Sequence, residues 1–377
     1  MFDWLETVLH DAVAGGQAPG VVAAVARGDE SQVAGAGLAT LGGAPMRRDT
    51  IFRISSMTKP ITAACALTLV DAGQVALDQP VQRWLPELAS RRVLRRPDGP
   101  LDDTVPAERP VMVRDLLTST WGFGMQGAMF MSEHPWPVVE AAEARALHTL
   151  GPPQPATTPE PDVWMARLGE LPLLAQPGER WLYQSSSQVL GVLAERVAGK
   201  PLDALLSERV LRPLGMVDTG FWTADTARLA TAYQRQQGVL AVSDPSEGQW
   251  SRRPAFCDGA GGLVSTADDL LRFGRMLGRG GAPVLRRETA AEMTRNQLTL
   301  EQRERVWPGF SFLDGRGWGF GLSVRPDGAY GWEGGFGTSW CNVPGDDLTV
   351  VVLTQRAADE TGMPAVCEEV LAAARAL

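Results

Sequence analysis

The pattern of apolar and polar positions is strand-like near both ends of the chain and helical between them. Near the start, apolar residues recur every three or four positions from Leu5 to Val13, which predicts an amphipathic helix that ends at Gly15. Short β-like runs follow at 21–26 and 32–37, and a glycine turn can connect them. The start of the chain is therefore expected to fold as a helix followed by a hairpin.

A second set of predicted strands lies near the other end. Apolar and β-branched residues dominate 317–324, 329–332, 338–343 and 348–354, and turns rich in glycine and aspartate separate these runs. A closing helix is expected over about 363–376. The simplest packing joins the strands from both ends in one antiparallel sheet, covered by the first and last helices.

Helical spacing dominates the middle of the chain. Helices are expected at 58–72, 111–118, 186–199, 202–211 and 266–278. Most of the prolines also fall in this region, and a proline-rich surface loop is expected at about 124–161.

The expected fold class is therefore α/β plus all-α, with an antiparallel sheet flanked by terminal helices and a helical domain inserted into it. The α/β domain would be discontinuous, consisting of residues 1–77 and 291–377. Residues 78–290 would form the mostly helical domain. A binding site is expected in the crevice between the two domains.

Composition excludes several classes of protein. With 44% hydrophobic and 21% charged residues among 377, the chain is neither disordered, collagen-like nor a coiled coil. A net charge of −9 argues against nucleic acid or an anionic membrane as a partner. The chain has only three histidines, three tyrosines and two lysines, so each of these residues that falls within a motif is less easily explained by chance.

The first residues do not form a secretory signal, because Asp3, Glu6 and Asp11 interrupt the apolar pattern. No apolar run approaches the roughly 18 residues that a membrane span needs. The four cysteines are scattered, which is typical of free thiols. The cytoplasm is therefore the expected location.

Motif searches leave few candidates for chemistry. The chain contains no G-x-S-x-G, no phosphate-binding G-x-x-x-x-G-K-[ST], and no histidine spacing suited to a metal. No cofactor and no metal are therefore expected.

The candidate that remains is Ser56-Met57-Thr58-Lys59. A serine and a lysine three residues apart at a helix start lie on one face, so the lysine can take or hold the serine proton. The helix start also supplies backbone N–H groups for a developing oxyanion. A surface lysine on an amphipathic helix is the alternative interpretation.

A lysine that carries its proton cannot act as a base, so a second group is needed. Tyr183 is the candidate, because a nearby lysine cation would favour its phenolate, which could deprotonate Ser56. The alternative is a half-buried core tyrosine that precedes a helix.

These residues and their order resemble the class C β-lactamase-like serine hydrolases, and most of all the family VIII carboxylesterases. The resemblance covers nearly the whole chain. The matching stretches are 51–59, 67–77, 115–118, 177–183, 190–191, 213–216, 259–273 and 331–337.

The resemblance implies a role for each matching residue. Ser56 would be the acylated nucleophile, Lys59 its helix partner and Tyr183 the general base. The backbone N–H groups of Ser56 and Gly335 would form the oxyanion hole. The fold implied is that of β-lactamases and DD-peptidases.

Two departures from the family pattern bear on the substrate. Trp332 stands where β-lactamases have a lysine and peptidases a histidine, so the pocket favours a neutral, partly apolar group over a carboxylate. Related carboxylesterases carry this tryptophan. Ser185 replaces the family's asparagine, which argues against amide hydrolysis, although Ser186, Ser187 or a water could compensate.

The segment at 119–123 also departs from the family pattern, and the methionine-rich stretch after it can either line a pocket or pack beneath a loop. Trp121, Phe123 and Ser185 are expected to contact substrate together with Trp332. Phe336 and Trp340 fit a pocket rim and a sheet core equally well, and Phe336 is included in the expected pocket.

The predicted function is a serine carboxylesterase that hydrolyses small-molecule esters, with short acyl chains favoured. The alternatives are a β-lactamase or DD-peptidase-like amide hydrolase, an acyltransferase, and a non-catalytic binding module. No nucleic acid and no membrane partner are expected, and the sequence does not indicate the oligomeric state.

Overall fold

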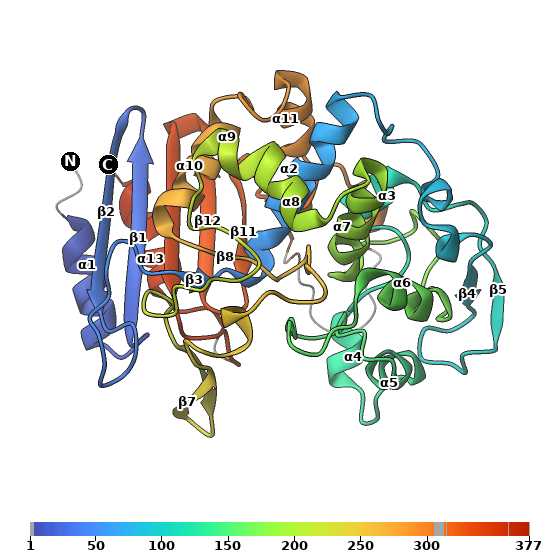
Figure 1. Ribbon diagram of the computed structural model, residues 1–377, viewed down its shortest axis with the longest axis horizontal. Helices are drawn as coiled ribbons and strands as arrows, with labels where there is room; N and C mark the ends of the chain where they lie inside the picture. The colour runs from blue at the N-terminus through green and yellow to red at the C-terminus, as the bar shows by residue number, and fades with distance from the viewer. Residues whose placement is uncertain (1–3, 305–312, 314, 361, 377) are drawn as a thin grey trace.

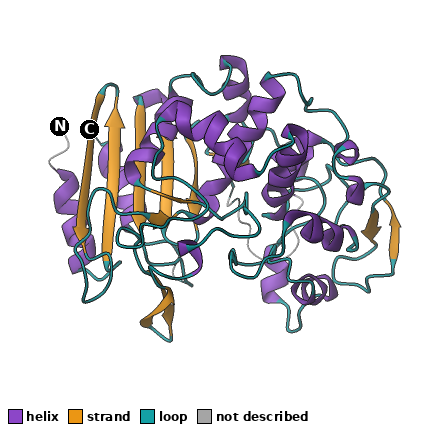
Figure 2. Cartoon of the chain, viewed as in Figure 1, coloured by secondary structure: helices purple, strands orange, loops and turns teal. Residues whose placement is uncertain are grey.

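The computed structural model describes residues 4–304, 313, 315–360 and 362–376, and its strands gather on one side with most helices on the other (Figures 1 and 2). A seven-stranded antiparallel sheet has the order β2-β1-β13-β12-β11-β10-β9. Strands from both ends of the chain therefore share one sheet, as the sequence predicted. The strands are β1 (Gly20–Arg27), β2 (Glu30–Gly37), β9 (Gly317–Trp318), β10 (Ser323–Val324), β11 (Tyr330–Gly334), β12 (Thr338–Val343) and β13 (Leu348–Thr354).

Strands β1 and β13 pair in the interior of this sheet, and both are mostly apolar and buried over nearly their whole length because both faces are covered. Val21 and Val25 of β1 face the terminal helices α1 (Trp4–Ala14) and α13 (Val366–Arg375). Val22 and Ala24 face the opposite side, where they join the main hydrophobic core. The two-residue alternation of a strand thus distributes one apolar run between two cores.

Helix α10 (Ala267–Gly278) corrects the expected domain boundary. It lies against β1, β12 and β13, on the face of the sheet opposite α1 and α13. Residues 267–278 therefore pack with the sheet, whereas the sequence assigned 78–290 to the helical domain. The apolar face of an amphipathic helix packs equally well on a sheet or on other helices, and only the tertiary contacts distinguish the two.

The expected strand 317–324 is also divided into β9 and β10. Gly319 N–H donates to the Leu322 carbonyl, and Gly321 adopts a φ of +74°, so the chain turns back on itself. The apolar residues in this turn remain buried, which is why the sequence pattern looked continuous.

Helix α2 (Thr58–Asp71) joins the two halves of the molecule. It is buried over most of its length and packs against α7 (Ser185–Ala198), while the 3-10 turn before it (Ser55–Met57) contacts β11 and β12. The other helices are α3 (Val113–Leu117), α4 (Gly127–Met131), α5 (Pro137–Ala144), α6 (Pro161–Gly169), α8 (Leu202–Leu206), α9 (Arg212–Leu214), α11 (Arg287–Met293) and α12 (Leu300–Glu304).

Four short 3-10 turns and a π-helical turn complete the helical segments: Val81–Arg83, Pro86–Leu88, Gln249–Ser251 and Pro344–Asp346 are 3-10, and Ser207–Leu211 is π-helical. The remaining strands form three small pairs, which are β3 (Phe52–Arg53) with β8 (Val264–Ser265), β4 (Arg92–Leu94) with β5 (Thr104–Pro106), and β6 (Ala232–Gln236) with β7 (Val239–Asp244).

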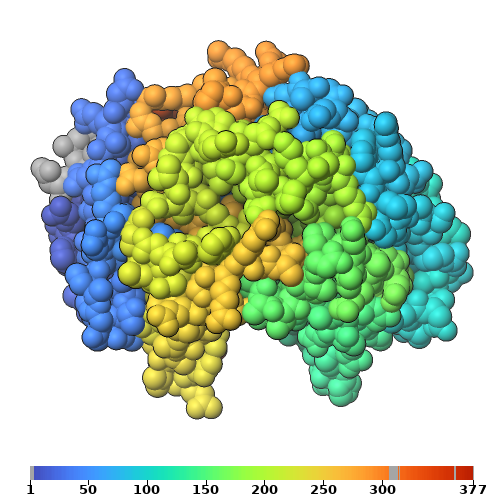
Figure 3. Space-filling view, in the orientation of Figure 1, coloured from blue at the N-terminus to red at the C-terminus, as the bar shows by residue number. Residues whose placement is uncertain are grey.

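The stretch expected to be one loop at about 124–161 contains the short helices α4 and α5. The space-filling view shows this segment in green and the β6–β7 hairpin in yellow as two projections with a notch between them (Figure 3). No helix among the described residues is long and apolar enough to cross a lipid bilayer.

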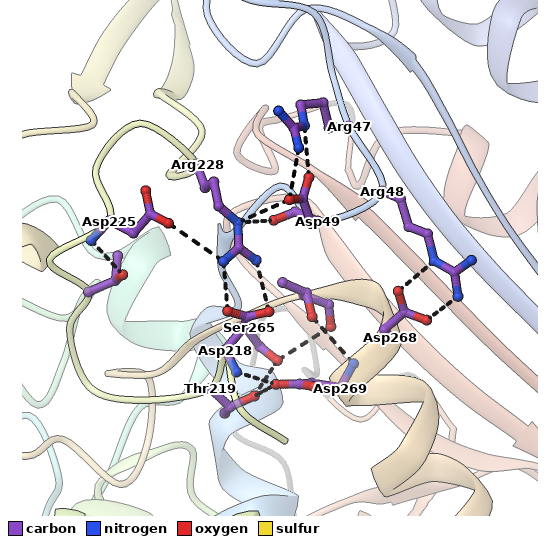
Figure 4. Close-up of polar contacts among 12 residues, drawn as sticks. Arg47, Arg48, Asp49, Asp218, Thr219, Asp225, Arg228, Ser265, Asp268 and Asp269 are labelled. Carbon is purple, nitrogen blue, oxygen red and sulfur yellow. Dashed lines mark hydrogen bonds and ion pairs between the residues drawn. The ribbon is translucent and has the colours of Figure 1, made fainter. Parts of the chain in front are cut away.

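A network of ion pairs holds the chain just before β3 (Figure 4). The Arg228 guanidinium donates to the Asp49 carbonyl at 2.9 Å and to the Asp218 carboxylate at 2.8 Å. Asp269 at the start of α10 accepts from Asp218 N at 2.8 Å and from Thr219 Oγ1 at 2.9 Å. These contacts tie the segment that leads to Ser56 to the helix on the sheet.

Candidate active site

Ser56 and Lys59 meet at the start of α2. Ser56 lies in the 3-10 turn and Lys59 is the second residue of the helix, so their side chains project from the same face. Lys59 Nζ lies 2.9 Å from Ser56 Oγ. Lys59 is only 1% exposed, which does not fit the alternative of a surface lysine.

Three acceptors surround the Lys59 amine. Besides Ser56, it donates to Gln184 Oε1 at 3.0 Å and to the Ala260 carbonyl at 2.7 Å. Burial lowers the pKa of Lys59 to about 7, and the negative charge of Asp258 opposes this shift. The neutral amine is therefore accessible at physiological pH and can accept a proton from Ser56.

Tyr183 lies beside this pair, directly before α7. Its N–H donates to the Met125 carbonyl at 3.1 Å, which holds it to the segment before α4. Burial raises the pKa of the Tyr183 phenol above its usual value, while hydrogen bonds from Ser56 and Trp332 lower it. Lys59 Nζ lies 4.4 Å from the centroid of the Tyr183 ring, so the cation faces the ring itself.

Trp332 on β11 contacts the tyrosine directly. Its indole Nε1 donates to Tyr183 Oη at 2.9 Å. The indole ring also packs edge-on against Trp318 at 4.8 Å between centroids, and the Arg316 guanidinium lies 4.9 Å from its centroid. An indole has one N–H, so Trp332 has no second donor for a substrate carboxylate.

Gly335 follows β11, at the turn next to Ser56. A side chain on the preceding Gly334 would collide with the Ile54 carbonyl, so the end of β11 must come very close to the turn that carries the nucleophile. A Cβ on Gly335 would lie 3.9 Å from Ser55 Oγ. The structure therefore brings together the two backbone segments that were expected to form the oxyanion hole.

Three of the expected substrate contacts are located elsewhere. Trp121, Phe123 and Ser185 are all 0% exposed and contact one another: Trp121 Nε1 donates to Ser185 Oγ, and Ser185 Oγ donates to the Phe123 carbonyl. They belong to the packing behind the site, because completely buried side chains present no surface to an ester. Of the suggested substitutes for the missing asparagine, Ser186 is likewise buried and hydrogen-bonded to Ser119.

Gln184 is the residue whose amide side chain contacts Lys59. Its Oε1 accepts from Lys59, and its Nε2 donates to the Gly151 carbonyl at 2.7 Å, which links the proline-rich segment to the catalytic amine. The family pattern places its asparagine at position 185, so the sequence did not single out Gln184. The available signal was an amide side chain adjacent to the candidate base.

Three further residues were considered as pocket or core residues: Phe336, Met125 and Trp340. Phe336 is half-buried and packs against Trp250, 5.7 Å between centroids, in a small cluster with Ile51 and Leu229. Met125, from the methionine-rich stretch, joins Tyr183 and Trp332 in one buried cluster. Trp340 is buried and packs on Phe273 of α10, so it belongs to the sheet core.

No group of three or more histidine, cysteine, aspartate or glutamate side chains among the described residues could hold a metal ion.

Comparison with known proteins decides the family. Residues 5–374 match the family model named Beta-lactamase. The chain belongs to the beta-lactamase family. This membership confirms the predicted fold class and identifies the chain as a serine hydrolase.

The sequence relatives of this beta-lactamase-family chain include a named esterase. Esterase EstB of Burkholderia gladioli is 32% identical over 386 residues, covering 94% of this chain and 90% of EstB. Protein Rv1367c of Mycobacterium tuberculosis is 41% identical over 340 residues, covering 84% of this chain and 80% of that protein. The match to EstB agrees with the predicted placement among the esterases of the β-lactamase fold.

Solved structures support the same fold. EstCE1, described as a hydrolase with promiscuous acyltransferase activity, has a TM-score of 0.77 at 26% identity and covers 96% of this chain and 95% of its own. Simvastatin synthase LovD of Aspergillus terreus has a TM-score of 0.76 at 22% identity, covering 97% and 95%, and at that identity supports the fold alone.

Proposed function

We propose that this serine hydrolase cleaves carboxylic esters of neutral small molecules, preferably with short acyl chains, through an acyl-enzyme on Ser56. The observation that carries the proposal is the buried contact of 2.9 Å between Lys59 Nζ and Ser56 Oγ, next to the Tyr183–Trp332 pair. A nucleophile, a proton acceptor and a second hydroxyl within one buried cluster are what acyl transfer requires.

In the acylation step, Ser56 Oγ attacks the ester carbonyl carbon while its proton moves to the neutral Lys59 amine. The negative charge that develops on the carbonyl oxygen is stabilised by the backbone N–H groups of Ser56 and Gly335. When the tetrahedral intermediate collapses, the bond to the alkoxide breaks and Tyr183 donates its phenolic proton to that oxygen. The Lys59 ammonium then returns a proton to Tyr183, which restores the pair.

Deacylation reverses these roles. A water molecule takes the place of the alcohol and gives its proton to Tyr183 as Tyr183 passes its own to Lys59, and the hydroxide oxygen bonds to the acyl carbon. The acid leaves when the bond to Ser56 Oγ breaks and the lysine ammonium returns its proton to that oxygen. The net reaction consumes one water and yields one acid and one alcohol.

The acid–base roles proposed for Lys59 and Tyr183 differ from those suggested by the sequence. A phenolate on Tyr183 with a charged Lys59 was expected, but burial favours the neutral forms of both groups. The proposal therefore gives the first proton transfer to Lys59 and the protonation of the leaving alcohol to Tyr183.

This assignment predicts a specific pH dependence. Only the unprotonated Lys59 accepts the Ser56 proton, so kcat/KM is expected to be lost as the pH falls through about 7. On the acid side of that pH, which is the acid limb of the profile, kcat/KM should decrease roughly tenfold per pH unit. The measurement is ester turnover from pH 5 to 10, with the rate of the Ser56→Ala variant subtracted at each pH. A single limb well above pH 9 would instead make the Tyr183 phenolate the base.

The preference for neutral substrates follows from the charges near Trp332. The single N–H of Trp332 is bonded to Tyr183, and Arg316 Nη1 donates to the Glu333 carboxylate at 2.7 and 2.9 Å. The Glu333 carboxylate thus balances the charge of the Arg316 guanidinium. A substrate carboxylate placed beside Trp332 would lose its hydration without gaining a cation that is free of a counter-charge.

The test is a comparison of kcat/KM for p-nitrophenyl butyrate and for a chromogenic cephalosporin, whose carboxylate and amide represent the alternative function. The ester is expected to be turned over at least about 100-fold faster, a difference of at least about 2.7 kcal/mol in transition-state stabilisation. Faster cephalosporin turnover would assign the chain to the amide hydrolases. An added alcohol such as 1-butanol shows in the same assay whether acyl transfer competes with hydrolysis.

A further inference from the structure

Asp258 is a buried carboxylate in the loop that contacts Lys59. It is 6% exposed, and none of the ion pairs among the described residues includes it. Its Oδ1 accepts from Ala260 N at 2.7 Å, and its Oδ2 accepts from Gln188 Nε2 of α7 at 2.9 Å. A carboxylate in such a position costs free energy of folding unless another group needs its charge.

One residue connects Asp258 to the catalytic amine. The Ala260 carbonyl accepts from Lys59 Nζ at 2.7 Å, and the Ala260 N–H donates to Asp258 Oδ1 at 2.7 Å. The carboxylate therefore fixes the backbone of Ala260 in the position from which its carbonyl contacts the amine. The charge of Asp258 also acts on Lys59 through space.

The packing of the loop keeps this chain in place. A Cβ on Gly259 would lie 2.6 Å from the Ser187 carbonyl of α7 and 3.0 Å from Thr62 of α2, so only glycine lets the loop come this close to both helices. The carboxylate is thereby held between the helix that carries Lys59 and the helix that follows Tyr183.

We propose that Asp258 is a positioning residue that holds the backbone of Ala260 against Lys59 and keeps a negative charge beside the catalytic amine. This inference rests on the proposed function, in which Lys59 accepts the Ser56 proton. The negative charge of Asp258 makes Lys59 a stronger base. It partly offsets the lowering of the Lys59 pKa by burial, so the amine holds the proton taken from Ser56 more firmly.

Other titratable groups face this cluster. Tyr183 lies against Lys59, and the charges of Glu333 and Arg316 on the sheet side act on Tyr183. From the proline-rich side, the pKa of His148 is lowered by burial, while the charge of Asp258 opposes the shift. Because the charge of His148 also interacts with Asp258, its contribution to the pH dependence has to be separated from that of Lys59.

The decisive variant is Asp258→Asn, which removes the charge and keeps the shape. The asparagine Oδ1 can still accept from Ala260 N–H, and its Nδ2 can donate to Gln188 Oε1, which has no hydrogen-bond partner among the described residues. We expect the acid limb of kcat/KM for p-nitrophenyl butyrate to move to lower pH by about 1 unit, because the amine loses a neighbouring negative charge. The plateau should fall by roughly 3- to 10-fold, because a less basic amine accepts the Ser56 proton less readily.

The matched control is Asp269→Asn. Asp269 is also a buried aspartate that accepts from a backbone N–H and a side chain, but it lies in the network at the start of α10 (Figure 4). Its replacement should leave the acid limb unchanged. Both variants are also measured in a His148→Gln background, where the same shift is expected for Asp258→Asn alone.

A second readout does not depend on the ester. A fluorophosphonate bonds to Ser56 Oγ and releases fluoride while the serine proton goes to Lys59, and the pH dependence of this labelling, followed by intact mass, should show the same shift. If the unmodified chain neither cleaves the ester nor labels, both the function and the role of Asp258 are overturned. If it does both and the Asp258→Asn limb coincides with that of the unmodified chain, only the role of Asp258 is overturned.

If Asp258→Asn does not fold, Gln188→Met decides the question. It removes one hydrogen bond that stabilises the carboxylate charge and leaves Asp258 itself in place. A smaller shift of the acid limb in the same direction would support the proposal, and an unchanged limb would overturn it.

Discussion

The Ser56→Ala variant is expected to lose ester turnover almost completely, with kcat reduced by at least about 10⁴-fold. The hydroxyl of Ser56 is the group that bonds to the acyl carbon, and its removal takes away the partner of Lys59 without disturbing the helix start. Kinetics with p-nitrophenyl butyrate give the loss in turnover, and intact mass after incubation with a fluorophosphonate should show no adduct.

The matched control for this variant is Ser132→Ala. Ser132 is exposed on the segment after α4, whereas Ser56 is buried, so solvent access alone would favour labelling of Ser132. We expect Ser132→Ala to retain both turnover and labelling. An adduct that persists in Ser56→Ala would place the nucleophile at another residue.

The second large effect is expected for Lys59→Met, which should reduce kcat/KM by about 10³- to 10⁴-fold. Methionine is similar in length and removes only the amine, so Ser56 loses its direct proton acceptor and the Ala260 carbonyl loses its donor. Because the native amine is buried at a cost, the free energy of unfolding should change little. Thermal unfolding measured beside the kinetics checks this.

The only other lysine in the sequence provides the control. Lys200 is partly exposed and ion-paired with Glu208 at 2.7 Å on the surface, and Lys200→Met is expected to leave kcat/KM within about twofold. If Lys59→Met kept activity within tenfold of the unmodified chain, the proton from Ser56 would have to leave by way of Tyr183 alone.

Local spacing was enough to predict part of the site. Ser56 and Lys59 are three residues apart at a helix start, and the geometry of a helix alone brings their side chains together. The period-2 and apolar patterns near both ends likewise predicted strands that pair in one sheet, because the free energy gained on burying such strands does not depend on where they lie in the chain.

The sequence was less informative where one type of residue suits two different environments. Trp121 and Phe123 were expected in the pocket, since large apolar side chains suit a pocket and a core equally well, and the structure buries both completely. Ser185 was assigned by its position after Tyr183, but the neighbouring Gln184 is the residue whose longer side chain extends to Lys59.

By itself, then, the sequence determined the fold class, the order of the catalytic motifs and the pairing of a serine with a lysine, because each depends on residues within one turn or on a repeating pattern. The tertiary structure decided how those groups behave. Tyr183 receives its hydrogen bond from Trp332, 149 residues away, and Lys59 contacts a carbonyl 201 residues away beside the buried Asp258. Proton affinities depend on burial and on nearby charges, and both are set by segments that meet only when the chain is folded.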